Sequence, residues 1–514
     1  MSEKSAKSAF TVFAMITATL FAKALGLFRS MLLAWTLGDL PEAVAFAAAS
    51  KIPGALFDLF FSAAISGTFI PLYGEARCKN EKSAFEFARA FFGACLLAAV
   101  FLSLSGAVFA PKIVALSAPK LVGESSALCA RLLRIMFPAT VFAAAVYTFS
   151  GIMQSHGSFI LPAAVSAASN LFIIFYLMLS GARFSVYALA AAYVFSWALQ
   201  FIVLAVPLAA KKRFPLPQIK PKNELLRKAF ARAPRIMAAS WLAPASALFA
   251  AFFCSFVSGS AIVLYDYASG IYTIISGIAV YGVGNYVFPA LSKIHAQGNA
   301  SLFARETERA VFCAIALMLP VFCAATVLAG EGVALLYAHG NFSMDAAKGC
   351  AEALRVLSAA MPAFAVSEIL YRAFCAAGKT KTLARASLAA ICTSLASNAL
   401  SLLCGGGLFG VCASFAAAQW VYALLLLFSA KKLFRGVYTA KDLKKYVRLA
   451  LGGALCFSAM ALLAQNFPFF SQLSPYILNF LKITIVFTTG IVIYLLYMYF
   501  TGLLRPISKK KEKR

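Results

Sequence analysis

The sequence predicts an all-α polytopic membrane protein with about 14 transmembrane helices, arranged as two pseudo-symmetric six-helix lobes plus two C-terminal helices. Of its 514 residues, 62% are apolar and only 12% are charged, and the mean hydropathy is +0.85. A soluble globule of this length needs more polar surface. Apolar runs of about 20 residues recur along the chain, which is the length a helix needs to cross a ~30 Å hydrocarbon core.

Polar stretches separate the apolar runs, and each run is long enough for a helix rather than a barrel strand. The predicted spans lie near 9–36, 43–73, 84–110, 126–153, 158–181, 184–209, 231–258, 261–290, 306–329, 351–377, 381–404, 407–429, 446–466 and 476–503.

Lysine and arginine set the predicted orientation, because cytoplasmic loops retain positive charge. With the N-terminus inside, the inward loops hold 33 such residues and the outward loops hold four. A wrong number of spans would invert later loops and destroy this bias. Both termini are therefore predicted to be cytoplasmic. The net charge of +28 follows from the same rule and from attraction to anionic lipids, so we do not interpret it as nucleic-acid binding.

A faint internal repeat supports the two lobes. Both halves have a Pro-to-Tyr spacing of nine residues followed by a Ser-Asn pair: Pro138 and Tyr147 with Ser169-Asn170, and Pro362 and Tyr371 with Ser397-Asn398. Six spans per half place the repeat axis along the membrane normal, which is one architecture of secondary transporters. The predicted domains are an N-terminal lobe 1–210, a cytoplasmic basic linker 211–230, a C-terminal lobe 231–430, a basic loop 431–445, two additional helices 446–503 and a basic tail 504–514.

Several residues are predicted to interrupt helices, either as hinges for rocking or as static kinks: Gly26, Pro53, Gly54, Pro71, Pro138 and Pro362. The twelve cysteines contain no CxxC pair, and most lie inside apolar segments, so we interpret them as packing residues. The three histidines are too far apart in the sequence to suggest a local metal site. Neither a phosphate-binding loop nor a Ser-His-Asp grouping appears, which argues against an ATPase motor or a hydrolase.

Short motifs follow one another in an ordered set over about residues 3–430: Lys23–Arg29, Lys51–Pro53 with Phe69–Pro71, Gly151–His156 with Leu161–Ala163, Tyr267–Ala268 with Phe288–Lys293, and Gly378–Thr382. This set resembles the MurJ (MviN) family, the lipid II flippases of bacterial peptidoglycan synthesis within the multidrug/oligosaccharidyl-lipid/polysaccharide exporter superfamily. Three positions depart from it. Phe57 stands where members carry an arginine, Ser30 where many carry an acid, and Gly270 near another family arginine.

The resemblance implies a flippase of the bacterial cytoplasmic (inner) membrane that serves cell wall biogenesis and cell shape, not an enzyme. Lipid II, or a related lipid-linked saccharide, would cross by alternating access of the two lobes. Its head group would occupy a central cationic cavity, and the last two helices would form a groove for its lipid tail. No cofactor is implied, and a membrane potential or an ion gradient would drive transport. Membrane lipids and the cell-wall synthesis machinery are the expected partners.

Three cations at membrane depth are the predicted substrate-binding residues. An ionisable side chain there costs at least ~2.5 kcal/mol, so each one needs a reason. Lys23 and Arg29 in the first helix and Lys51 in the second are suited to a lipid pyrophosphate, because arginine in particular matches phosphate oxygens. The alternative is that they pack a bent helix or extend to the membrane interface.

Four further residues are predicted charge partners or ion-coupling groups. Asp58 lies two turns after Lys51 and either neutralises the cationic site or lowers its cost. Asp266 binds a coupling cation or hydrogen-bonds to neighbouring tyrosines. Glu368 and Arg372, at i and i+4, are expected to form a structural ion pair rather than a substrate site.

Rival functions remain open at this point. One is an exporter of another polyprenyl-pyrophosphate-linked saccharide, or a multidrug antiporter. Another is a polyprenyl-dependent glycosyltransferase or polymerase, which would need acidic residues in a long outward loop, where the chain has only scattered acids. A third is a non-transporting scaffold of the division machinery. In such a scaffold, loss of the cavity charges with an intact fold would have no effect on function.

Overall fold

The computed structural model describes residues 3–62, 64–220, 223–434, 440–467 and 474–503. In this part of the chain every regular element is a helix. The predicted all-α fold class is confirmed. The predicted basic tail 504–514 lies outside the described residues, as do 221–222 of the predicted linker and 435–439 of the predicted basic loop.

The number of candidate spans agrees with the prediction. Among the described residues, 11 helices are long and apolar enough to cross a membrane, and three bent helix pairs raise this to 14 if each pair is one span. The pairs are α6 (Gly123–Met136) with α7 (Ala139–Ser155) at 42°, α10 (Glu224–Ser240) with α11 (Leu242–Val257) at 55°, and α15 (Met344–Ser358) with α16 (Met361–Ala376) at 48°.

Proline explains two of these bends, as predicted. Pro138 separates α6 from α7, and Pro362 stands in the first turn of α16. The ring removes a backbone donor and clashes with the preceding turn, so the helix breaks there.

Pro53 and Gly54 do not interrupt α2 (Pro41–Phe57), which continues through both. Gly26 does not behave as predicted either, because α1 (Glu3–Leu37) continues through it. Its missing side chain instead admits Asn170, whose Nδ2 lies 3.3 Å from where a Cβ would be and donates to Ala22 O at 3.0 Å.

The chain divides into two compact units. Unit 1 comprises Met1–Gly270, His339–Ala346 and Thr380–Ala418, and unit 2 comprises Ile271–Ala338, Ala347–Lys379 and Gln419–Arg514. Three helices have residues in both units: α12 (Gly259–Ala296), α15 and α18 (Gly407–Leu433). The predicted lobes 1–210 and 231–430 stay a prediction.

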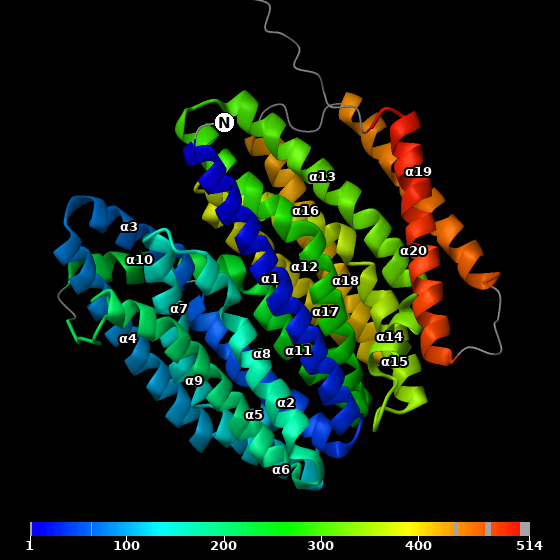
Figure 1. Cartoon of the computed structure of the whole chain (residues 1–514), viewed down its shortest axis with the longest axis horizontal. Coiled ribbons are helices and arrows are strands. Elements are labelled where there is room, and N and C mark those ends of the chain that lie inside the picture. Colours follow the sequence, from blue (N-terminus) through cyan, green and yellow to red (C-terminus); the bar gives the residue numbers. More distant parts are fainter. Residues whose placement is uncertain (1–2, 63, 221–222, 435–439, 468–473, 504–514) are drawn as a thin grey trace, which may run out of the picture. The chain divides into compact units, whose positions relative to one another are not determined.

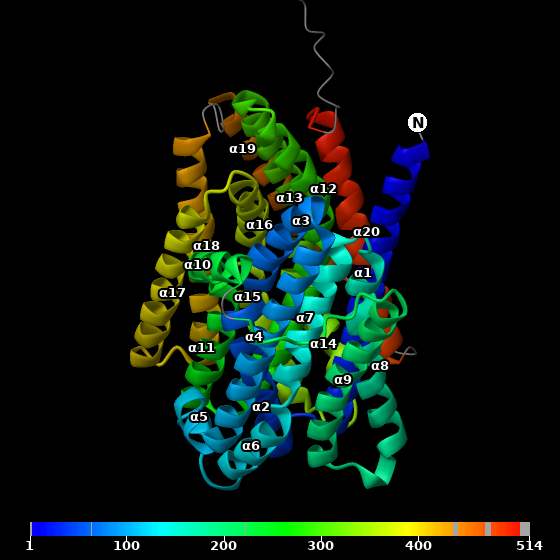
Figure 2. The same cartoon turned by 90° about the vertical axis from the view of Figure 1, so that its left-hand side faces the viewer.

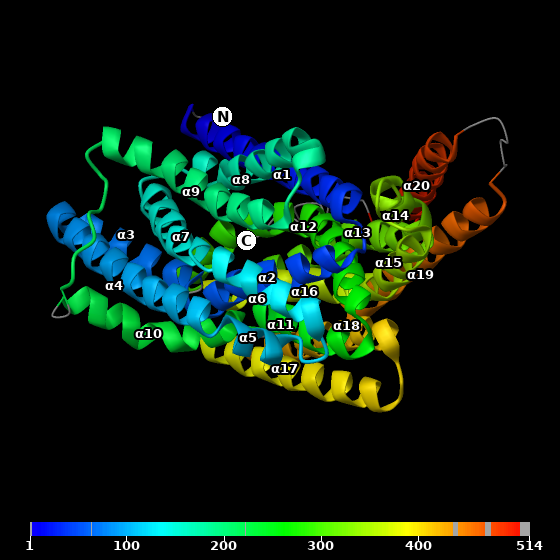
Figure 3. The same ribbon diagram turned by 90° about the horizontal axis from the view of Figure 1, so that it is seen from below.

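Unit 1 holds most of the elements. Besides α1, α6, α7, α10 and α11, it contains α2 (Pro41–Phe57), the π-helical turns η1 (Asp58–Ser62) and η2 (Ile65–Phe69), α3 (Ile70–Lys79), α4 (Glu81–Val108), α5 (Ala110–Ser117), α8 (Ile160–Ser180), the short η3 (Gly181–Arg183), α9 (Val186–Ala210) and α17 (Thr380–Leu403). Within it, α1 runs alongside α8 (Figure 1) and α17 lies beside α10 and α11 (Figure 3). The short helices α5 and α6 lie at the end away from α3 (Figure 2).

Aromatic side chains fill the core of unit 1. Phe69 is fully buried and stacks on Tyr73 and Phe91, while Phe149 packs against Phe92 and Phe201. Offset and tilted ring pairs of this kind stabilise by about 0.5–1.5 kcal/mol beyond their burial. They hold α3, α4, α7 and α9 together, which fixes the backbone around the π-helical turns that follow α2.

Unit 2 contains α13 (Ala300–Val327), α14 (Ala329–Tyr337), α16, α19 (Ala440–Gln465) and α20 (Pro475–Phe500). The last two helices run side by side (Figure 1), with α19 against α13 and α20 against α14. Glu308 of α13 accepts from Lys445 at 3.3 Å and from Tyr446 at 3.1 Å. Lys482 of α20 pairs with Glu331 of α14 at 2.6 Å. Both ion pairs attach the C-terminal helices to the rest of unit 2.

All twelve cysteines are free thiols, and seven of them are buried. Cys323 and Cys456, for example, face the backbone of Gly453 and Gly490 at 3.5 Å each. This agrees with their interpretation as small packing residues.

Candidate functional site

Five of the seven candidate residues lie in unit 1: Lys23, Arg29, Lys51, Asp58 and Asp266. The structure joins two of them directly. Lys51 Nζ of α2 lies 2.7 Å from Asp266 Oδ1 of α12. The two side chains are 21% and 35% exposed, so the pair is mostly withdrawn from solvent. The ammonium also lies 5.6 Å from the centre of the Tyr265 ring. Lys51 is thus held by an acid and an aromatic face, and Asp266 has a charged partner that sequence reasoning did not pair with it.

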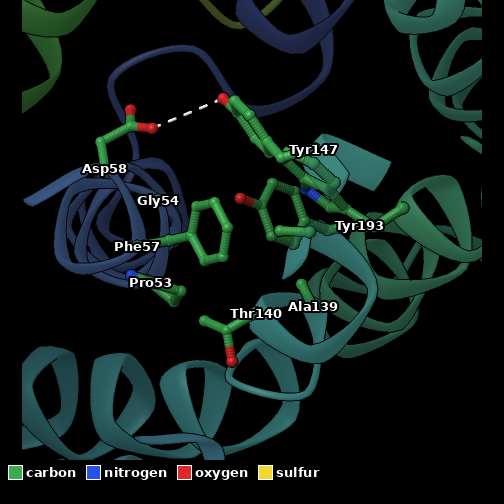
Figure 4. A pocket seen from close by; sticks show the side chains of 10 residues that line it. Pro53, Gly54, Phe57, Asp58, Ala139, Thr140, Tyr147 and Tyr193 are labelled. Atoms are coloured by element: carbon green, nitrogen blue, oxygen red, sulfur yellow. Dashed lines mark hydrogen bonds between the residues drawn. The ribbon is translucent and has the colours of Figure 1, made fainter. Parts of the chain in front are cut away.

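Asp58 does not pair with Lys51. Seven residues of helix separate their backbones by about 10 Å along the axis, which is too far for a direct ion pair. Instead, the Tyr147 hydroxyl of α7 donates to Asp58 Oδ1 at 3.4 Å (Figure 4). Tyr147 was noted in the sequence only as part of the repeat, so this contact was missed.

Asp58 lines a small cavity of about 60 Å³ between the C-terminal end of α2, the start of η1, α7 and α9. Its wall is made of one acid, one threonine and mostly aromatic or small residues: Pro53, Gly54, Phe57, Asp58, Ala139, Thr140, Ala143, Tyr147, Tyr193 and Trp197. In Figure 4, Phe57 stands beside Tyr147 and Tyr193, and its ring stacks on the ring of Phe61 with 5.1 Å between the ring centres. Position 57, where the family resemblance leads one to expect an arginine, is therefore apolar and buried here.

Lys23 and Arg29 lie on α1, the helix that packs along α8. Both are half-buried. Arg29 interacts electrostatically with Tyr193 of α9, a lining residue of the Asp58 cavity. Arg29 follows Lys23 by six residues, which is a rise of about 9 Å, or a little under two turns of helix. They can therefore present two cations along one stretch of α1.

The remaining pair lies in unit 2. Arg372 Nη2 lies 2.8 Å from Glu368 Oε1, and Arg372 Nε donates to the same oxygen at 3.1 Å. The predicted ion pair therefore forms. A Cβ at Gly284 of α12 would come within 2.5 Å of Arg372 Nε, so the guanidinium also packs closely on α12. This double attachment fits a structural role.

A second, open cavity of about 500 Å³ lies between α5 and α6. Arg131 and Arg134 line it, at the end of unit 1 that the charge pattern predicts to be outward. The Tyr187 hydroxyl lies 3.5 Å from Arg131 Nη1, and Arg134 Nε donates to Ala107 O at 3.3 Å.

At the opposite end of unit 1, three polar side chains form a chain of contacts. Arg77 donates to His156 Nδ1 at 3.0 Å and to Ser155 O, so Nδ1 carries no hydrogen, and His156 Nε2 lies 3.1 Å from the Tyr73 hydroxyl. His156 occupies the turn after α7. Burial lowers the pKa of His156 below its ordinary value of 6.5, and the charges of Arg213 and Arg77 lower it further.

The lowered pKa of His156 predicts that the stability of the folded protein depends on pH. Because the folded pKa is lowered, the unfolded protein binds a proton first as the pH falls through about 6.5, and stability drops below that pH. We expect the unfolding temperature of the purified protein to fall between about pH 7.5 and about pH 5.5, and to fall less in His156→Gln. Equal pH dependence of the two proteins in thermal unfolding would contradict this.

No group of three His, Cys, Asp or Glu side chains capable of holding a metal ion occurs among the residues that the structure describes. The site is instead a set of separate charges at membrane depth: a compensated lysine, an acid among phenols, and two cations on α1. Such a set can bind an anion and change its own charge, and it offers no nucleophile with an adjacent base.

Comparisons with known proteins agree with this. The family described as lipid II flippase MurJ matches residues 33–495. A probable lipid II flippase MurJ of Bdellovibrio bacteriovorus is 25% identical over 462 residues, which cover 88% of this chain and 87% of the relative. The lipid II flippase MurJ of Burkholderia cenocepacia is 25% identical over 453 residues, covering 86% and 87%.

Solved structures show the same fold. A lipid II flippase MurJ in an inward closed conformation aligns with a TM-score of 0.80 at 22% identity, covering 96% of this chain and 99% of that one. An inward-facing MATE family multidrug resistance transporter of the MOP superfamily aligns with a TM-score of 0.65 at 14% identity, covering 82% and 97%. Since the family match spans most of the chain, this multi-pass membrane protein belongs to the lipid II flippase MurJ family, a family of transporters rather than enzymes.

Proposed function

We propose that the chain moves lipid II from the cytoplasmic to the outer leaflet of the bacterial inner membrane by alternating access. The observation that carries this proposal is the pair of half-buried cations on α1, Lys23 and Arg29, in a chain of this family. A lipid pyrophosphate must exchange its hydration for fixed positive charge when it enters a membrane protein. Arginine offers a planar fork for phosphate oxygens, and lysine adds a point charge.

Lys51 has a different role in this proposal. Its charge is already compensated by Asp266, so it contributes little net attraction for an anion in the conformation described here. Breaking the Lys51–Asp266 pair would release a cation toward substrate and separate α2 from α12. An arriving pyrophosphate can compensate Lys51 in place of Asp266, and this exchange would couple binding to the conformational change.

The orientation, driving force and partners complete the proposal. The excess of lysine and arginine on one side supports cytoplasmic termini. Because the chain contains no phosphate-binding loop, a membrane potential or an ion gradient supplies the energy. The partners would be lipid II, membrane lipids and the cell-wall synthesis machinery.

One observation favours a second substrate. Phe57 is only 2% exposed and packs in an aromatic wall at the position where the family resemblance implies an arginine, so one expected cationic contact is missing. Another polyprenyl-pyrophosphate-linked saccharide, with a different head group, would keep the pyrophosphate contacts at Lys23 and Arg29 and would not need this arginine.

A reconstituted transport assay tests the proposal. Purified protein in liposomes is given fluorescent lipid II in one leaflet, and a membrane-impermeant quencher reports its transfer to the other. We expect transfer of lipid II well above empty liposomes and above a phospholipid with the same fluorophore. Transfer of another polyprenyl-linked saccharide but not of lipid II would favour the second substrate, and transfer of neither would contradict both.

A further inference from the structure

Asp58 is an acid deep in a membrane span. It lies 17 residues after the start of the candidate span Pro41–Lys79, or about 25 Å along the helix. Its side chain borders the 60 Å³ cavity, which is large enough for water. An ionised carboxylate in such a place is costly unless a cation accompanies it.

The groups around Asp58 do not supply that cation. The preceding helix α2 offers Lys51, which is bound to Asp266, and η1 itself offers the Ser62 hydroxyl, four residues after Asp58, which carries no charge. From α7 comes the Tyr147 hydroxyl, and from α9 come Tyr193 and Trp197 of the cavity wall.

The other neighbouring helices add no cation either. From α10 and α11, which pack against η1, the Trp241 indole at their junction donates to Leu59 O at 2.9 Å. The charge of Arg29 on α1 interacts electrostatically with Tyr193 of the cavity wall. Within the described ranges, no lysine, arginine or histidine nitrogen lies within 4.0 Å of the Asp58 carboxylate.

A proton satisfies this arrangement better than a metal cation. A hard metal cation needs several oxygen ligands. Here the side chains of the cavity wall offer the two carboxylate oxygens and the hydroxyls of Thr140, Tyr147 and Tyr193, which is five oxygens against the roughly six that such a cation takes. One proton taken from hydronium converts the carboxylate to a neutral acid and leaves water, and no other co-reactant is needed. The neutral acid still accepts the Tyr147 hydrogen bond.

The backbone at Asp58 also departs from regular α-helical geometry. The chain passes from α-helical to π-helical geometry at Asp58, four residues after Gly54 and five after Pro53. Single π-helical turns interrupt regular hydrogen bonding and frequently mark functional sites. The charge state of Asp58 therefore acts on a segment that is not locked into regular helix.

We infer that Asp58 is a proton-binding site of the transport cycle, neutral in the conformation described here and ionised when its cavity opens to bulk water. The link to transport rests on the proposed function, whereas the binding of a proton does not. This assigns one coupling ion, the proton, to one residue.

Infrared spectroscopy of the purified protein in lipid nanodiscs tests the proton itself. We expect the C=O stretching band of a protonated carboxylic acid at neutral pH in the wild type and in Asp39→Asn, a matched control at a partly exposed turn. Asp58→Asn should lack the band, and Tyr147→Phe should shift its frequency because one hydrogen bond is lost. A band unchanged in Asp58→Asn, or one that disappears when Na⁺ replaces K⁺, would overturn the inference.

A transport assay tests whether this proton is coupled to lipid movement. In liposomes, lipid II transfer by the wild type should vary with pH, while Asp58→Asn, fixed in the neutral form, should transfer at least tenfold more slowly and without pH dependence. A pH-dependent Asp58→Asn would contradict coupling at this residue. If the wild type transfers no lipid II, the proposed function fails, and the infrared result still decides whether Asp58 binds a proton.

Discussion

Asp266→Ala is expected to abolish transport and to lower the free energy of unfolding by about 2 kcal/mol, between the values for breaking an exposed and a fully buried ion pair. The change removes the carboxylate that neutralises Lys51 at membrane depth and leaves the ammonium beside the Tyr265 ring. Denaturant or thermal unfolding of the purified protein measures the first effect, and lipid II transfer in liposomes measures the second.

Two controls separate charge from packing. Lys51→Met combined with Asp266→Leu removes both charges, so most of the lost stability should return without transport. Lys220→Met breaks a pair with Glu86 that is 3.8 Å long and half-exposed, and should cost at most about 1 kcal/mol. Full activity of Asp266→Ala would show that the pair is not part of the transport mechanism.

Joint replacement of Lys23 and Arg29 by alanine is expected to weaken binding of a polyprenyl pyrophosphate about 100-fold. Each charge-assisted hydrogen bond contributes about 1.5–3 kcal/mol, and two of them give at least about 3 kcal/mol. Titration of the lipid into protein in detergent, followed by intrinsic fluorescence, measures the change. Arg29→Lys keeps the charge but loses the planar fork, so its affinity should be intermediate.

The control for this prediction lies in the same unit. Arg131→Ala together with Arg134→Ala removes two arginines from the open cavity between α5 and α6 and should leave the affinity for the pyrophosphate unchanged. If this control weakens binding as strongly as the change on α1, the phosphate site lies elsewhere or the loss reflects total charge.

The spans and most of their bends could be predicted because they depend on local chemistry. Apolar length fixes a membrane helix, and Pro138 and Pro362 break helices by losing a donor. Gly26 was predicted wrongly as an interruption for an equally physical reason. A glycine within a helix either weakens it or admits a close neighbour, and only the structure shows that Asn170 is that neighbour.

The ionic pairs divide in the same way. Glu368 and Arg372 are four residues apart, so helix geometry alone predicts their contact, which the structure confirms. Lys51 and Asp266 are distant in sequence, as are Asp58 and Tyr147, and nothing local indicates which helices bring them together. Asp58 was therefore assigned to the nearest cation along its own span, although its carboxylate accepts a hydrogen bond from Tyr147 of α7.

The function of the whole chain is tested most directly by complementation. Bacteria depleted of their own lipid II flippase would express this chain, with its presence in the membrane verified, and growth and outward exposure of lipid II would be followed together. The account predicts that both are restored by the wild type and lost again with Arg29→Ala. Failure of the membrane-inserted wild type to restore lipid II exposure would contradict lipid II as its substrate.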